Sequence, residues 1–258
     1  MRILFIGDIF GRPGRTIVRE KLPLLVAEHR ADLIIANGEN SAAGFGITPA
    51  LAEELFEMGI DVITTGNHVW DQKQFVIEIT QVERVLRPYN FPPGAPGIGA
   101  VILQADGEDV LVMNLQGRVF LPELDDPFRA ADAILAAHGG PKIIFCDMHA
   151  EATSEKTAMG WHLDGRVSAV VGTHTHIPTA DARVLPGGTA YVTDVGMVGP
   201  RDSVIGVQKE AALRRFLTGM PSRFETGTGV VTFNSVLVTI NRRTGRATSI
   251  QRIDREHT

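Results

Sequence analysis

Two histidines, His174 and His176, stand two residues apart in the run VSAVVGTHTHIP, where a β-branched strand is expected to end. Imidazole is a common ligand of Zn, Fe and related metals. In an extended chain, positions i and i+2 point to the same face, about 6.5–7 Å apart. Such a separation is wide for one ion, but it suits two ions about 3.5–4 Å apart. The spacing therefore predicts one histidine for each of two metal ions.

Further ligand-type side chains follow four other runs that are expected to be strands. The runs are RILFIG, LIIANG, ITTG and IIFCDM, and the residues beside their ends are Asp8, Glu39, Asn40, Asn67, His68 and His149. Each residue alone has an ordinary explanation as a helix cap, a turn residue or a half-buried polar group. Ligands of open α/β sheets bind outside the carboxyl ends of the strands. Five strands with such endings therefore predict one shared site. Its mixed oxygen and nitrogen donors, with no thiolate nearby, favour Fe, Mn or Zn over Mg or Ca alone.

The elements that would position this site alternate between strand and helix in the first 80 residues. Three β-α units predict a parallel sheet covered by helices, one of which begins at Thr48-Pro49 and ends before Gly59. Asp106-Gly107 and Thr244-Gly245 each predict a hairpin turn, the second within the tail GVVTFNSVLVTINRRTGRATSIQRID. We therefore expect an α/β fold of two mixed sheets packed face to face with helices outside, and a single domain over residues 1–258.

The composition is that of an ordinary globular protein, with 21% charged and 44% hydrophobic residues among 258. The net charge of -5, without a Lys/Arg block, argues against a protein that binds long nucleic acids. The lone Cys146, in the apolar run KIIFC, cannot form an intrachain disulfide and is expected to be buried and inert. The apolar stretch before Asp8 is too short for a signal peptide or a membrane span, so we expect a cytoplasmic protein that does not bind membranes.

The ordered set of GD (7–8), GEN (38–40), GNH (66–68), His149 and GTHTH (172–176) resembles the calcineurin-like metallophosphoesterases. GENSAAGFGIT and TDVGMVGPRDSVIG are more closely similar to the YmdB-like branch, described as 2′,3′-cyclic-nucleotide phosphodiesterases. Each tripeptide is a weak signal, but their order from Arg2 to the closing hairpin is highly specific. The resemblance implies a four-layer α/β/β/α sandwich.

The resemblance also implies a role for each motif residue. Asp8 and His176 would hold the first metal, and Glu39 would bridge both metals. The remaining ligands of the second metal would be Asn67, His149 and His174. This chain departs from the wider superfamily at position 10, where Phe10 replaces the histidine of Asp-x-His. In the YmdB-like branch, Asn40 of the GEN motif would take its place.

Two such metals, Fe first and Mn or Zn as alternatives, can acidify a bridging water and supply hydroxide at neutral pH. His68 matches the proton donor of the family and would act as the general acid. The expected substrates are small phosphodiesters such as 2′,3′-cyclic nucleotides. A phosphomonoesterase with the same metals, and a metal-containing regulatory or binding protein, are the alternatives. The oligomeric state is left open, a homo-oligomer included.

Several residues near these motifs have two interpretations each. Arg12 and Arg15, in GRPGR, would either bind phosphate or lie solvated at a helix start. Arg201 is a loop arginine that could reach the site, and Phe45 would either shelter a substrate ring or simply pack. Asp71, three residues after His68, could orient the His68 ring.

Overall fold

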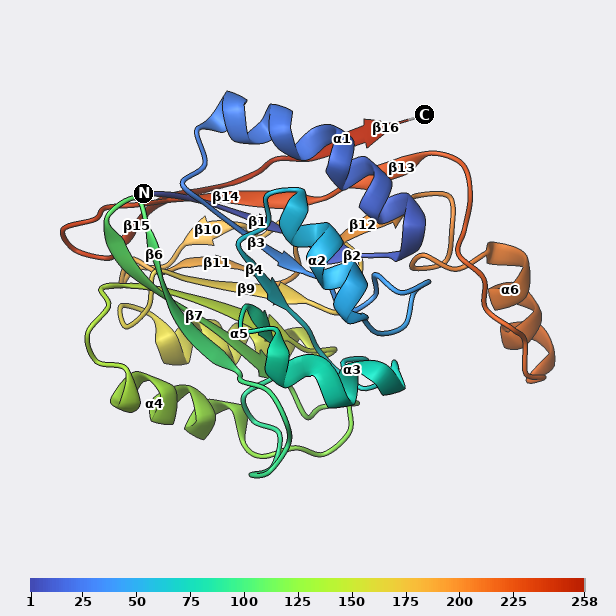
Figure 1. The fold of residues 1–258 in the computed structure, drawn as a ribbon, viewed down its shortest axis with the longest axis horizontal. Helices are drawn as coiled ribbons and strands as arrows, with labels where there is room; N and C mark the ends of the chain where they lie inside the picture. The colour runs from blue at the N-terminus through green and yellow to red at the C-terminus, as the bar shows by residue number, and fades with distance from the viewer. Residues whose placement is uncertain (258) are drawn as a thin grey trace.

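The computed structural model describes residues 1–257, and its first sheet has six strands (Figure 1). In sheet order they are β15 (Ala247–Arg252), β14 (Ser235–Ile240), β1 (Arg2–Ile6), β3 (Leu33–Asn37), β4 (Val62–Thr64) and β5 (Val85–Leu86). The last four strands run parallel, whereas β14 is antiparallel to both β1 and β15. The sheet is therefore mixed, as expected.

The second large sheet is also mixed and six-stranded. Its order is β10 (Arg183–Val184), β11 (Ala190–Val192), β9 (Ala169–Thr173), β8 (Ile143–His149), β7 (Glu108–Gln116) and β6 (Ala100–Ala105). The predicted hairpin between β6 and β7 is confirmed. Asp106 and Gly107 have φ of 45° and 80°, the left-handed conformations that a tight hairpin turn requires.

A third sheet of four short strands corrects the prediction for the C-terminal tail. Its order is β16 (Arg255–His257), β13 (Val231–Phe233), β12 (Met197–Pro200) and β2 (Asp8–Ile9). The turn at Thr244-Gly245 does join β14 to β15, but Val231–Phe233 belongs to the third sheet. The prediction of one hairpin over the whole tail was wrong because alternating apolar residues do not tell which sheet a strand joins.

The two large sheets pack face to face across an apolar core. The rings of Phe5 and Phe145 stack between them with centroids 5.5 Å apart. The outer face of the first sheet is covered by α1 (Gly11–His29), α2 (Pro49–Glu57) and α3 (Lys73–Glu78) with the short 3-10 turn Ile79–Gln81. The second sheet carries α4 (Pro127–Ala137) and α5 (Thr153–Leu163). The four-layer α/β/β/α order is thus confirmed.

Local sequence signals account for some of the helices. The Thr48 hydroxyl accepts a hydrogen bond from the Leu51 amide at 3.3 Å, and Pro49 opens α2 as predicted. In contrast, α5 and α6 (Lys209–Thr218) were not predicted. Helix α6 projects from the body of the molecule (Figure 1), and Ala212 is its one buried residue. Within residues 1–257, none of the helices combines the length and apolar character of a membrane span.

Candidate metal centre

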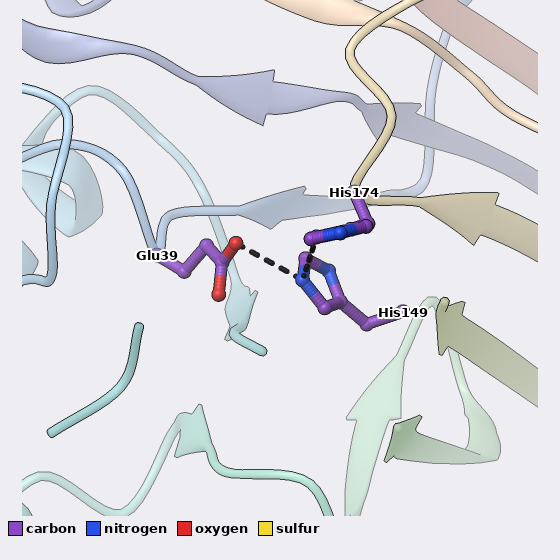
Figure 2. Close-up of side chains that lie close together, drawn as sticks. All are labelled: Glu39, His149 and His174. Atoms are coloured by element: carbon purple, nitrogen blue, oxygen red, sulfur yellow. Dashed lines mark hydrogen bonds and ion pairs between the residues drawn. The ribbon is translucent and has the colours of Figure 1, made fainter. Parts of the chain in front are cut away.

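All seven predicted metal ligands lie near one another, where strands of the two large sheets end. Glu39 and Asn40 follow β3, Asn67 follows β4, His149 ends β8, and His174 and His176 follow β9. Asp8 opens β2 directly after β1. Figure 2 shows that Glu39, His149 and His174 come from separate segments and point toward a common centre. Two sets of contacts divide the seven residues, and the first set centres on His149.

The His149 group consists of Glu39, Asn67, His149 and His174. Nε2 of His149 lies 3.0 Å from Oε1 of Glu39, 3.0 Å from Oδ1 of Asn67 and 3.1 Å from Nδ1 of His174. Two of these contacts are the dashed lines of Figure 2. Ligand atoms that share one ion at about 2.1 Å lie about 3.0–3.4 Å apart. The spacing in this group is therefore that of a metal site.

The protonation of His149 strengthens this fit. The Thr173 hydroxyl donates to the Asp147 carboxylate at 2.7 Å, so it accepts from Nδ1 of His149 at 2.9 Å. A neutral His149 therefore carries its lone pair on Nε2, where three other acceptor atoms already point. Four lone pairs at such distances repel one another unless a cation lies among them. The donor set fits a transition metal.

In the metal-free chain, a proton can partly replace that cation. Burial by itself raises the pKa of Glu39, but the adjacent His149 outweighs it and holds the pKa at about 2. For His149 the signs are reversed. Burial lowers its pKa and the Glu39 carboxylate raises it, and the net shift is upward. The two groups thus favour an ion pair when no metal is present.

His174 is held in its neutral form. Its Nε2 lies 3.2 Å from a carboxylate oxygen of Glu151, which fixes the ring proton there and leaves the Nδ1 lone pair toward His149. Burial, and then the charge of His149, lower the pKa of His174 to about 3. The ring therefore keeps a lone pair at neutral pH.

The His176 group consists of Asp8, Asn40 and His176. The Ile205 carbonyl accepts from Nδ1 of His176 at 2.8 Å, so its Nε2 holds the lone pair. That Nε2 lies 3.1 Å from Nδ2 of Asn40 and 3.8 Å from Oδ1 of Asp8. Asn40 also donates to Oε1 of Glu39 at 3.3 Å. As a metal ligand Asn40 would offer Oδ1 instead, which requires a half-turn of its amide.

Asp8 supplies a second observation that fits a bound cation. Its carboxylate is fully buried, and Oδ1 has no hydrogen-bond partner among residues 1–257. The other oxygen accepts from the His174 backbone amide at 3.3 Å. Burial raises the pKa of Asp8 well above its ordinary value. A buried carboxylate without a donor is costly, and a metal ion would offset that cost.

Position 10 holds a buried phenylalanine that packs against its neighbours and offers no metal-binding atom. Phe10 is 3% exposed, and its ring lies edge-on to His176 with centroids 5.7 Å apart. A Cβ added at Gly44 or Gly206 would come within 2.5 or 2.6 Å of this ring. The two glycines therefore make room for a phenyl ring where the wider superfamily has an imidazole.

The turn that carries His174 and His176 differs from the extended chain assumed in the prediction. Strand β9 ends at Thr173, and the two histidines have φ of 100° and 66°, in the left-handed region. Such conformations cost about 1–3 kcal/mol each for residues other than glycine. Their rings still reach different groups, but a bend separates them.

A buried ion pair, which sequence reasoning missed, holds this turn. One carboxylate oxygen of Asp194 accepts from the Thr175 amide at 3.1 Å, from the Thr175 hydroxyl at 2.7 Å and from Lys156 Nζ at 2.7 Å. The Lys156 and Asp194 side chains are 1% and 0% exposed. The motif TDVGM contains Asp194, but nothing in its spacing pointed to Thr175.

His68 lies beside the candidate metal ligands, and its ring is held by the Asp71 carboxylate. Nδ1 is 2.7 Å from Oδ2 of Asp71, as the sequence suggested, and the His68 amide donates to Oε2 of Glu39 at 3.1 Å. Phe45 contacts the His68 ring edge-on, with centroids 5.2 Å apart. His68 therefore presents Nε2 away from Asp71.

A cleft of about 820 Å³ opens over these groups and has His68, His174 and His176 in its lining. Phe45 lines it too, whereas the three arginines considered earlier do not. Arg15 pairs with Glu54 at 3.2 Å, Arg201 pairs with Asp202 and Glu256, and Arg12 is exposed. Arg12 and Arg201 therefore have surface positions, whereas Arg15 is partly buried and also donates to the Ser41 carbonyl at 2.5 Å.

The YmdB-like protein family model matches residues 4–253. The chain belongs to the YmdB-like family. A 2′,3′-cyclic-nucleotide 2′-phosphodiesterase of Bacillus subtilis is 50% identical over 254 residues, which cover 98% of this chain and 96% of that relative. The family assignment agrees with the motifs, and the relative extends over nearly the whole chain.

Several solved structures have the same fold as this chain. A hypothetical protein from Thermus thermophilus is 44% identical, with a TM-score of 0.94 and full coverage of both chains. A structure described as a novel phosphatase of Mycoplasma pneumoniae is 34% identical, with a TM-score of 0.93 over 99% of this chain and 93% of that one. A 5′-nucleotidase precursor from Thermus thermophilus, 14% identical with a TM-score of 0.60 over 98% of this chain and 54% of that one, shares the fold alone.

Proposed function

We propose that this YmdB-like protein is a two-metal phosphodiesterase that hydrolyses small phosphodiesters, 2′,3′-cyclic nucleotides first among them. The observation that carries the proposal is the meeting of three acceptor atoms within 3.1 Å of a fourth, His149 Nε2. The Bacillus subtilis relative, which bears the name of this activity, supports the choice of substrate.

The proposed ligands are the members of the two groups described above. The His149 group would hold one ion and the His176 group the other, with Glu39 in contact with both groups. Fe, Mn and Zn all suit such nitrogen and oxygen donors. When bound, two such ions acidify water and neutralise charge on the phosphoryl oxygens.

His68 would supply the proton for the leaving oxygen. The Asp71 carboxylate accepts from Nδ1 at 2.7 Å, which orients the ring and leaves Nε2 to hold the transferred proton. In a 2′,3′-cyclic nucleotide, a water that has released one proton to the solvent would form a bond from its oxygen to phosphorus, and the bond from phosphorus to the 2′ oxygen would break. The proton on Nε2 passes to that oxygen, and the product is a 3′-monophosphate.

The test compares two leaving groups in the unmodified protein and in His68→Ala. A ribose oxygen needs a proton as its bond breaks, whereas a nitrophenolate hardly does. The variant should lose about 10²–10⁴-fold in kcat/KM on a 2′,3′-cyclic nucleotide and far less on a nitrophenyl phosphodiester. Metal content should stay unchanged. An equal loss on both substrates would point to positioning, and a loss of metal would make His68 a ligand.

A phosphomonoesterase using the same centre is the second candidate, because the Mycoplasma pneumoniae structure is described as a phosphatase. Rates on a cyclic nucleotide, a linear diester and a monoester, measured on one metal-loaded sample, separate the two. Turnover of the monoester alone would decide for the second candidate. Turnover of none would favour the metal-containing regulatory or binding protein.

A further inference from the structure

The wall of the cleft away from the metal centre is built by α6 and the segment that follows it. Arg215, Phe216 and Phe224 belong to this wall, and His68, His174 and His176 line the same cleft. A ligand whose phosphate lies at the histidines therefore has its remaining atoms directed into a space bounded by α6. With a volume of about 820 Å³, the cleft has the size of ordinary small-molecule sites.

This wall offers aromatic surface that packing of the chain does not use. Phe216 lines the cleft and is nevertheless 82% exposed. The Arg215 guanidinium, which also lines the cleft, lies 5.2 Å from the centre of the Phe224 ring. Phe45, the other aromatic candidate, contacts His68 edge-on and so lies beside the proposed acid. Phe216 is thus an aromatic side chain of the lining that leaves most of its surface available for a flat group.

We propose that Phe216 is a stacking platform for the nucleobase of the substrate, in the same wall of the cleft as Arg215 and Phe224. The proposal rests on the function proposed above, because it places the cyclic phosphate at the metal centre and the base against α6. Stacking on an aromatic side chain tolerates every base, since each base has a π face. The platform would select nucleotides over phosphodiesters that lack a base, and it would not select among the bases.

The neighbouring Leu217 provides a matched control. It is 83% exposed on the same helix, but it does not line the cleft. Phe216→Ala and Leu217→Ala therefore remove similar amounts of exposed apolar surface from one helix. Both changes lie at the solvent face of α6, so neither removes buried packing. A difference between them reports on the cleft rather than on the folding of the helix.

The experiment measures kcat and KM for 2′,3′-cyclic AMP and for glycerol 1,2-cyclic phosphate, which has no base. Phe216→Ala should raise KM for cyclic AMP about 5- to 150-fold, with kcat little changed. KM for the glycerol compound should stay the same, and Leu217→Ala should alter neither substrate. Phe216→Trp should restore the KM for cyclic AMP, because its ring also stacks.

A binding measurement separates failure of the platform from failure of the proposed function. Calorimetric titration with 3′-AMP should show a Kd that rises in Phe216→Ala and not in Leu217→Ala, whether or not the protein turns over cyclic nucleotides. The proposal would be overturned if the two alanine variants had equal effects and both changed the oligomeric mass in size-exclusion chromatography. This face would then be an interface between copies of the chain. A loss of equal size on both substrates would overturn it as well.

Discussion

The two halves of the candidate metal centre are built differently. In the His149 group, acceptor atoms alone meet at 3.0–3.1 Å from His149 Nε2. In the His176 group, the Asn40 amide nitrogen lies between the acceptors, and His176 stands 3.8 Å from Asp8. The first group therefore already has the spacing of a metal site, whereas the second would have to rotate an amide and close a gap to hold an ion.

The hydrogen bonds that fix His149 and His176 also differ, and they too favour the His149 group. His149 is fixed by Thr173 and Asp147, which are both fully buried. His176 is fixed by the carbonyl of Ile205, a residue that is 50% exposed and has a left-handed φ of 48°. Partners of this kind commonly change metal affinity about 10- to 100-fold. We therefore expect the His149 group to bind its ion more tightly than the His176 group.

The largest effect should come from Glu39→Ala, which would remove the residue common to both groups. Its Oε1 lies 3.0 Å from Nε2 of His149 and 3.3 Å from Nδ2 of Asn40. We expect metal analysis after loading with Fe, Mn or Zn to fall from about two ions per chain toward none. Glu53→Ala, at an exposed position of α2, is the control. Retention of one full ion would show that Glu39 serves one group only.

A paired comparison of His149→Ala and His176→Ala would test the asymmetry directly. Each variant loses one imidazole, but His149→Ala should empty the tighter site and His176→Ala the weaker one. The ion remaining in His176→Ala should then resist a competing chelator longer than the ion remaining in His149→Ala. Equal chelator resistance in the two variants would contradict the asymmetry.

Asp194→Asn should weaken both groups, because Thr175 lies between His174 and His176 and Asp194 accepts its amide and its hydroxyl. The change also leaves Lys156 without its buried partner, which typically costs about 3–5 kcal/mol and lowers Tm. Thr175→Val is the milder variant, since it removes the hydroxyl contact and spares the ion pair. We expect it to weaken metal binding with a small change in Tm.

Asp164→Asn is the control for this turn. Its carboxylate accepts from the backbone amides of Gly187 and Thr189, at 2.8 and 3.4 Å, away from the metal centre. It should lower Tm and leave metal affinity unchanged. If both Asp variants lower metal affinity in proportion to Tm, the role of Asp194 is stability alone.

The contrast between the two groups also explains which parts of the site the sequence predicts. Each strand that ends in a ligand-type residue is recognisable from its local sequence, so the sequence alone predicts that His149 and Glu39 lie together. The bend at His174 is not predicted, because it depends on Asp194, which is distant in sequence and contacts Thr175 and its ion-pair partner Lys156 only in the folded chain. The separation of β13 from β14 was missed for a similar reason, since sheet membership depends on partners far along the chain.

A smaller effect is expected for Asn40→Ala. The residue contacts His176 Nε2 at 3.1 Å, so its loss should weaken the His176 group more than the His149 group. Metal titration should show one affinity reduced about 10-fold or more and the other nearly unchanged. If both ions are retained with unchanged affinity, Asn40 is a hydrogen-bond donor in the turn and no ligand.

The smallest expected effect tests whether the His149 group is formed before metal binds. Cys146 lies on β8, three residues before His149, and is fully buried. Burial raises the pKa of its thiol well above the ordinary value, so it should react very slowly with Ellman's reagent at neutral pH. Removal of metal with a chelator should leave it unreactive, because buried side chains already hold His149 in place. Full reaction in denaturant is the control. Rapid labelling after metal removal would show that the ion itself holds β8 closed, and the contrast between the two groups would then disappear.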